Sequence, residues 1–140
     1  MTIRSLLLLL ALAALAGGCS AKSVPAQLSG KVTFKGQAVP AGWISFTPEV
    51  TAEFGQVKVF QIKEGVYDSS QENEPGLYPG TYQIRIAGFD GKRIPLYGQG
   101  KQIFNPIEDN YTVPDGTSTK DFVIPDSAGQ NVKIQPTADT

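Results

Sequence analysis

The sequence contains no histidine and a single cysteine among its 140 residues. Without histidine, neither a Ser-His-Asp triad nor a histidine-based zinc site can form. A glycine-rich phosphate loop is missing as well, because the glycines of residues 88–91 and 98–100 do not open a helix. The sequence therefore predicts a protein with no catalytic residues, no bound cofactor and no metal. A serine–lysine dyad stays open, although no motif points to one.

An excess of charge of one sign is also missing. The chain has 12 basic and 13 acidic residues, and the two signs are interspersed without a basic stripe. Nucleic-acid binding depends on clustered lysine and arginine, so no nucleic-acid partner is expected. The acidic residues of 68–74 and 108–109 have oxygen ligands that suit calcium, but their spacing matches no calcium-binding loop. Solvated surface charge is the favoured interpretation.

One long apolar run is present, and it spans only eleven residues, 6–16. It follows a basic residue, Arg4, and precedes two glycines. A bilayer core needs about 20 apolar residues, so this run is too short for a membrane-spanning helix. A charged start, a short apolar segment and small residues predict a secretory signal peptide over residues 1–18.

The single cysteine, Cys19, lies directly after this segment. Residues 15–19, L-A-G-G-C, resemble the lipobox of bacterial lipoproteins, with Ala16 where leucine is commonest. The resemblance implies cleavage before Cys19, a diacylglyceryl group on its thiol and an acyl chain such as palmitate on its amine. Two or three chains would hold the protein on a membrane, since one chain alone binds marginally. Localisation in the cell envelope is expected, and Ser20 favours the outer membrane.

After the signal, no window shows a helical period, and the 15 glycines and 10 prolines of the chain disfavour long helices. Residues that alternate between apolar and polar instead predict short strands, of which 81–87 is the clearest. The expected fold is all-β, a single antiparallel β-sandwich of about seven strands. Residues 19–27 form the lipidated tether, 28–135 the sandwich and 136–140 a disordered tail. The other expected strands cover residues 28–34, 39–47, 56–63, 119–124 and 131–135.

Three motifs follow one another in the first half of the sandwich. They are G-K-V-T-F-K-G-Q-A-V-P-A-G-W-I-S-F-T-P at 30–48, E-G-V-Y at 64–67 and P-G-T-Y-Q-I-R-I at 79–86. In this order they resemble the carboxypeptidase regulatory-like domains, whose fold is the transthyretin-like (prealbumin-like) sandwich. The resemblance implies that fold and an absence of catalysis, because the regulatory domain of those peptidases carries no zinc ligands.

Four residues of these motifs have predicted structural roles. Gly36 and Gly65 are expected to take positive φ angles in hairpin turns. Tyr67 and Tyr82 are expected to bury their rings while their hydroxyl groups reach the rim of the core.

The candidate ligand surface consists of Trp43, Phe89 and Tyr97. Trp43 has the parity of an outward-facing strand residue, and the other two lie in the glycine-rich segment 88–100. Together they would form a platform for a sugar or a peptide. The favoured alternative is that this segment folds back and covers Trp43, because large exposed apolar patches are uncommon.

Two functions follow from these observations. The first is a non-catalytic, membrane-anchored lipoprotein that acts as a protein-interaction or structural module, for example by adding a strand to the sheet of an envelope protein. The second is a glycan- or small-ligand-binding module that uses the 88–100 loop and Trp43. The first is preferred.

Overall fold

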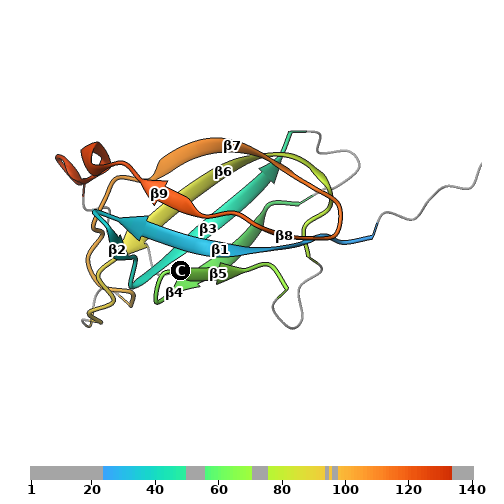
Figure 1. Cartoon of the computed structure of the whole chain (residues 1–140). Coiled ribbons are helices and arrows are strands. Elements are labelled where there is room, and N and C mark those ends of the chain that lie inside the picture. The colour runs from blue at the N-terminus through green and yellow to red at the C-terminus, as the bar shows by residue number, and fades with distance from the viewer. Residues whose placement is uncertain (1–23, 50–55, 71–75, 94, 96–97, 134–140) are drawn as a thin grey trace, which may run out of the picture.

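The computed structural model describes residues 24–49, 56–70, 76–93, 95 and 98–133. Within these ranges the chain forms a sheet of nine strands and one short 3-10 helix, η2 (Figure 1). The elements are β1 Gln27–Phe34, β2 Gln37–Ala38, β3 Ala41–Pro48, β4 Lys58–Lys63, β5 Val66–Asp68, β6 Gly80–Phe89, β7 Ile107–Val113, β8 Thr117–Thr119, β9 Phe122–Ile124 and η2 Asp126–Gly129.

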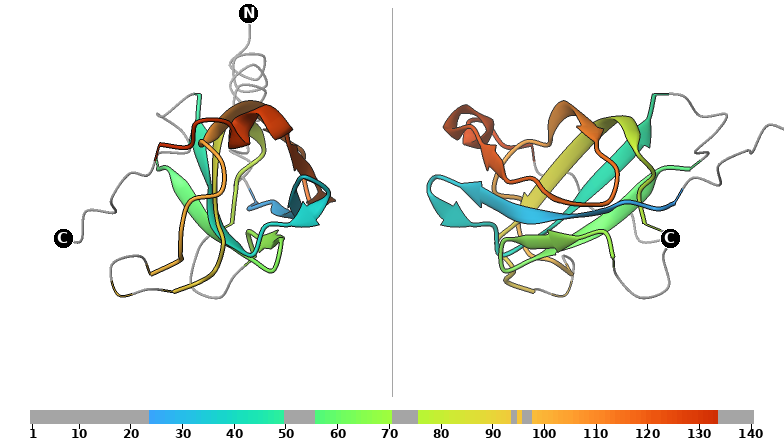
Figure 2. Two further views of the ribbon diagram at one scale, coloured as in Figure 1. Left: turned by 90° about the vertical axis from the view of Figure 1, so that its left-hand side faces the viewer. Right: turned by 45° about the vertical axis from the view of Figure 1, so that its right-hand side comes forward.

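The strands follow the order β2-β1-β5-β4-β3-β6-β7, with β8 and β9 both paired to β1. Neighbours along this order are antiparallel, whereas β8 and β9 run parallel to β1. The sheet curls, so that β1, β8 and β9 cross over β3 and β6 (Figures 1 and 2). The predicted all-β sandwich is therefore confirmed, with two parallel pairs that the sequence analysis did not anticipate.

The core lies between the two layers and is filled by alternate residues of each strand. In β1, for example, Leu28 and Val32 are fully buried while Gln27 and Lys31 are exposed. This period of two places one apolar face of each strand against the opposite layer. The largest fully buried side chains are Tyr67, Phe46, Phe104, Leu28, Ile44, Ile62, Leu77, Ile84, Ile86, Ile124, Val32 and Val39.

Tyr67 links the two layers. Its ring packs against Phe46 of β3 and Phe122 of β9, with centroid distances of 6.5 and 5.9 Å. Its hydroxyl donates a hydrogen bond of 2.7 Å to the carbonyl oxygen of Lys120, between β8 and β9. Tyr82 is arranged similarly, since its buried ring carries a hydroxyl that donates to the Tyr78 carbonyl at 2.9 Å. Both tyrosines thus confirm the predicted combination of a buried ring and a bonded hydroxyl.

Two tight turns contain the glycines predicted to have positive φ. Lys35 and Gly36 have φ angles of 50° and 74°, and Glu64 and Gly65 have 50° and 73°. Consecutive positive φ angles define the type I′ turn, whose twist matches that of the adjoining strands. A Cβ atom on Gly65 would also lie only 2.6 Å from that of Ala38.

Some predicted boundaries are wrong. The strand expected at 119–124 is split in two, because β8 pairs with the first half of β1 and β9 with the second. Residues 131–133 of the strand expected at 131–135 are not in a strand, and η2 precedes them. At the other end the sheet begins before residue 28: Ala26 is fully buried and bridges to Leu77.

The signal peptide 1–18, Cys19 and the tail 136–140 lie outside the described residues. Among the residues that are described, no helix has the length and apolar character needed to cross a bilayer.

Tyr67 should make stability depend on alkaline pH. Burial, and to a smaller degree Tyr111 and Asp121, raises the pKa of Tyr67 well above its usual value. An unfolded tyrosine ionises near pH 10, so the unfolded state gains stability above about pH 10 while folded Tyr67 stays protonated. Tyr67→Phe should lower stability at pH 7 by about 1–2 kcal/mol, because the Lys120 carbonyl loses its donor. The same substitution should also make the loss of folding stability above pH 10 less steep.

Urea unfolding at pH 7 to 11 measures both effects. An equally steep alkaline decline in the two proteins would contradict this role of Tyr67.

Candidate functional site

The outer face of β3, β4 and β6 carries Trp43. Because Ile44 and Phe46 point into the core, Trp43 and Ser45 point outward. Trp43 lies in register with Gln61 on β4 and with Ala87 on β6. Its side chain points outward, as predicted, but is half-buried because neighbouring strands lie on both sides of β3.

Apolar and charged groups surround Trp43 on this face. The apolar side chain of Val59, which lies in register with Ser45, is 57% exposed to solvent. On the other side of Ser45, Arg85 of β6 lies opposite Glu108 of β7. The face therefore has an apolar centre with charges toward β7. We refer to Trp43, Val59 and Arg85 as the outer face; Ala87, also on this side of β6, is buried.

At its base, the segment 88–101 forms a hairpin, which we call the 88–101 hairpin. Phe89 still belongs to β6, in register with Ala41, and bridges to Gln102. The next residue, Asp90, donates its backbone N–H to the Lys101 carbonyl at 2.9 Å. Its Oδ1 accepts the backbone N–H groups of Lys92 at 2.9 Å and Lys101 at 3.0 Å. One carboxylate thus fixes the base of the hairpin.

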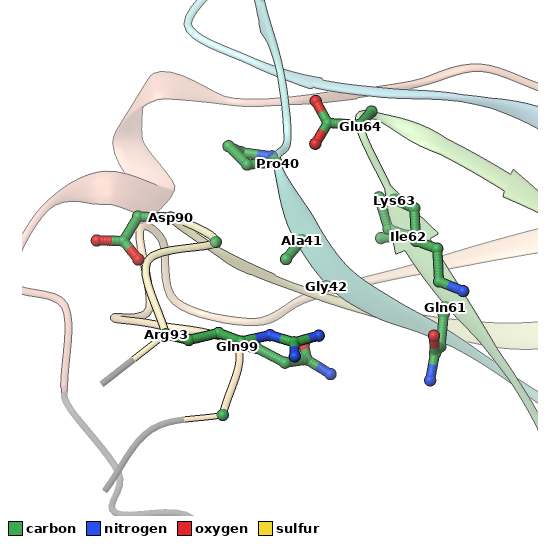
Figure 3. A pocket seen from close by; sticks show the side chains of 12 residues that line it. Pro40, Ala41, Gly42, Gln61, Ile62, Lys63, Glu64, Asp90, Arg93 and Gln99 are labelled. Carbon is green, nitrogen blue, oxygen red and sulfur yellow. The ribbon is translucent and has the colours of Figure 1, made fainter. Parts of the chain in front are cut away.

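A pocket of about 540 Å³ lies between this hairpin and the adjacent parts of β3 and β4. Figure 3 shows Arg93 and Gln99 extending side by side from the hairpin, with Gln61 and Lys63 of β4 across from them. The volume is within the range of small-ligand sites, about 300–1,000 Å³. The residues that line it are Pro40, Ala41, Gly42, Gln61, Ile62, Lys63, Glu64, Asp90, Gly91, Arg93, Gly98 and Gln99.

The structure brings together two of the three residues predicted as a ligand surface. Trp43 and Phe89 both belong to the outward-facing set of β3 and β6, whereas Tyr97 lies outside the described residues. Neither Trp43 nor Phe89 lines the pocket. Residues of the predicted segment 88–100 line the pocket, together with Lys63, which the sequence analysis did not name; Arg93 lies in that segment but was not singled out.

The pocket is lined mainly by polar and charged groups. Its polar side chains are amides, ammonium, guanidinium and carboxylate groups. In the parts of the chain that are described, no three histidine, cysteine, aspartate or glutamate residues gather as a metal site would require.

The hairpin depends on Gly100. This glycine has a φ angle of +92°, and a Cβ atom there would lie 2.0 Å from Asp90 Oδ1. Gly100→Ala should therefore displace the Asp90 carboxylate from both backbone N–H groups and lower stability by about 1–3 kcal/mol. Gly98→Ala is the matched control, because its Cβ would have no neighbour within 4 Å. Thermal unfolding and amide hydrogen exchange of Lys92 and Lys101 measure the change, and equal exchange in the two variants would count against this role.

No family model and no curated protein matches the chain. Among solved structures, the chain is similar to a DUF3823 family protein from Parabacteroides merdae, with 16% sequence identity and a TM-score of 0.41. The match covers 73% of this chain and 46% of that protein. A similarity of this size assigns neither a family nor a function. The chain is thus described by its own architecture, a β-rich module with a half-buried tryptophan and a polar pocket on one side.

Proposed function

We propose that the chain is a non-catalytic lipoprotein of the cell envelope that contacts another protein through its outer face. The observation that carries this proposal is the exposure of valine side chains on and beside β4, the strand that pairs with the Trp43 strand. Val59 on β4 is 57% exposed, and Val57, directly before that strand, is 54% exposed. An aromatic residue among apolar neighbours, with charges such as Arg85 and Glu108 at the side, has the composition of a protein interface.

A contact through the sheet edge is less well supported. β7 is the last strand of the order, so its free edge is the candidate for strand addition. However, the Asn110 N–H already donates to Asp109 Oδ1 at 2.8 Å within the same strand. Two carboxylates, Glu108 and Asp109, and the prolines at 106 and 114 further discourage an added strand. The face, rather than the edge, is the proposed contact.

Anchoring through lipid on Cys19 fits this arrangement. Figure 1 shows β1 entering the sheet at the end opposite to the 88–101 hairpin. A lipid at residue 19 would then hold the entry end of the sandwich near the membrane, the outer membrane by the resemblance of Ser20 to sorting signals. The hairpin would be directed away from the lipid. The absence of histidine from the whole chain supports the non-catalytic part of the proposal.

Replacing the proposed lipid site should release the protein from the membrane. Cys19→Ser removes the thiol that would carry the diacylglyceryl group, so most of the protein should move from the membrane pellet to the soluble fraction. Fractionation of cells, with mass spectrometry of the mature N-terminus, measures the change. Equal membrane recovery of the two forms, with an unmodified Cys19, would refute the lipoprotein proposal.

A charge placed in the outer face should weaken the protein contact. Val59→Lys puts an ammonium group on β4 opposite the strand that carries Trp43, where a bound partner would desolvate it. The amount of partner that is crosslinked should fall by about tenfold or more. Val123→Lys is the control, because Val123 is 76% exposed on β9, in the other layer. Crosslinking in intact cells compares the two. The proposal fails if both variants are crosslinked to the partner as well as the unchanged protein is. It also fails if both are folded and lose the partner to the same extent.

The pocket favours a second candidate function, the binding of a glycan or small ligand at the 88–101 hairpin. Gln61 lines the pocket and is the register neighbour of Trp43. The fluorescence of this tryptophan, the only one in the chain, should therefore shift when the pocket is filled.

A further inference from the structure

We infer that the pocket under the 88–101 hairpin binds a small polar molecule through an oxyanion held between Lys63 and Arg93. This inference deepens the second candidate function and is independent of the proposed protein contact. The site is made by two parts of the chain that lie far apart in sequence, β4 and the hairpin.

The first support is a pair of cations without counterions. Lys63 ends β4 and Arg93 lies on the hairpin, and both side chains are exposed where they line the pocket. Over the described part of the chain, neither side chain takes part in an ion pair or a hydrogen bond. Two like charges that face one cavity repel each other, and an anion between them would turn this repulsion into attraction. A guanidinium group also matches the two oxygens of a carboxylate or phosphate.

The acidic residues of the lining do not fill this role. Asp90 Oδ1 already accepts two backbone N–H groups. Figure 3 shows the Asp90 carboxylate pointing away from Arg93, and the Glu64 carboxylate turned toward Pro40 while the Lys63 side chain extends toward Gln61. Neither carboxylate points into the space between the Lys63 and Arg93 side chains, which is therefore left for a ligand.

The second support is the nature of the other groups on the cationic side. Gln61 and Gln99 line the pocket next to Lys63 and Arg93, and both are exposed. An amide side chain donates and accepts hydrogen bonds, so it suits hydroxyl groups. The combination fits an acidic sugar, whose carboxylate would lie between the cations and whose hydroxyls would contact the amides. Free phosphate shares the oxyanion chemistry but leaves the amides unused.

The test is the binding of sodium glucuronate to the full mature protein, measured by calorimetry and by Trp43 fluorescence. Glucose and inorganic phosphate are titrated in parallel. Glucuronate should bind more tightly than glucose, and Arg93→Gln and Lys63→Gln should each weaken its binding by about tenfold or more. Lys92→Gln is the matched control, because it removes the same charge from the neighbouring hairpin residue, which does not line the pocket. This variant should change affinity less than twofold.

Each other outcome has a defined meaning. Phosphate binding that requires Lys63 and Arg93, without glucuronate binding, would support the oxyanion site and replace the sugar by a phosphate. Glucose binding that ignores both substitutions would overturn the oxyanion inference while leaving a ligand-binding function. If Lys92→Gln weakened binding as much as the other two substitutions, the loss would reflect the net charge of the protein, and the oxyanion inference would be overturned. No binding of any of the three probes would overturn both the inference and the second candidate function, and would leave the test at Val59 unaffected.

Discussion

The sharing of β1 between two sets of partners is the constraint on which the rest of this fold depends. Eight residues form ladders with four strands: β5 and β8 along the first half, β9 and β2 along the second. The parallel partners β8 and β9 come from a part of the chain far from β1 in sequence, so this strand joins distant segments. Tyr67 reinforces this junction, since its hydroxyl reaches the carbonyl between β8 and β9. The long strands β3 and β6 then have a fixed inner face, and their outer face follows by alternation.

The outer face and the pocket both result from this separation of each strand into an inner and an outer side. The core accepts only one face of β3, β4 and β6, so Trp43 and Val59 are left on the side that no other element of the described chain covers fully. The pocket forms where β6 continues into the hairpin and the Asp90 carboxylate holds both arms of it together. A rigid base of this kind places Arg93 opposite Lys63 without needing a buried charge. The protein contact and the ligand pocket are thus adjacent but separate uses of one layer.

The sequence predicts those features that depend on local alternation and turn chemistry. The parity of Trp43, the glycine turns and the buried rings of Tyr67 and Tyr82 all follow from neighbouring residues. Long-range pairing does not, and so the break between β8 and β9 was missed: it arises because Asp121 turns aside to accept the Lys31 N–H at 2.7 Å, across 90 residues. The shared lining of one pocket by Arg93 and Lys63 is not predicted, for the same reason. No periodic pattern relates a hairpin residue to the end of a strand 30 positions earlier.

The entry of the chain at one end of β1 has a mechanical consequence. If lipid holds the N-terminal side and a partner pulls on the layer behind it, the force runs along the axis of β1. Hydrogen bonds on both sides of the strand are then loaded together in shear, rather than opened one after another as in the peeling of a hairpin. The strand that organises the fold would also be its strongest mechanical element, joining the membrane to whatever the module contacts.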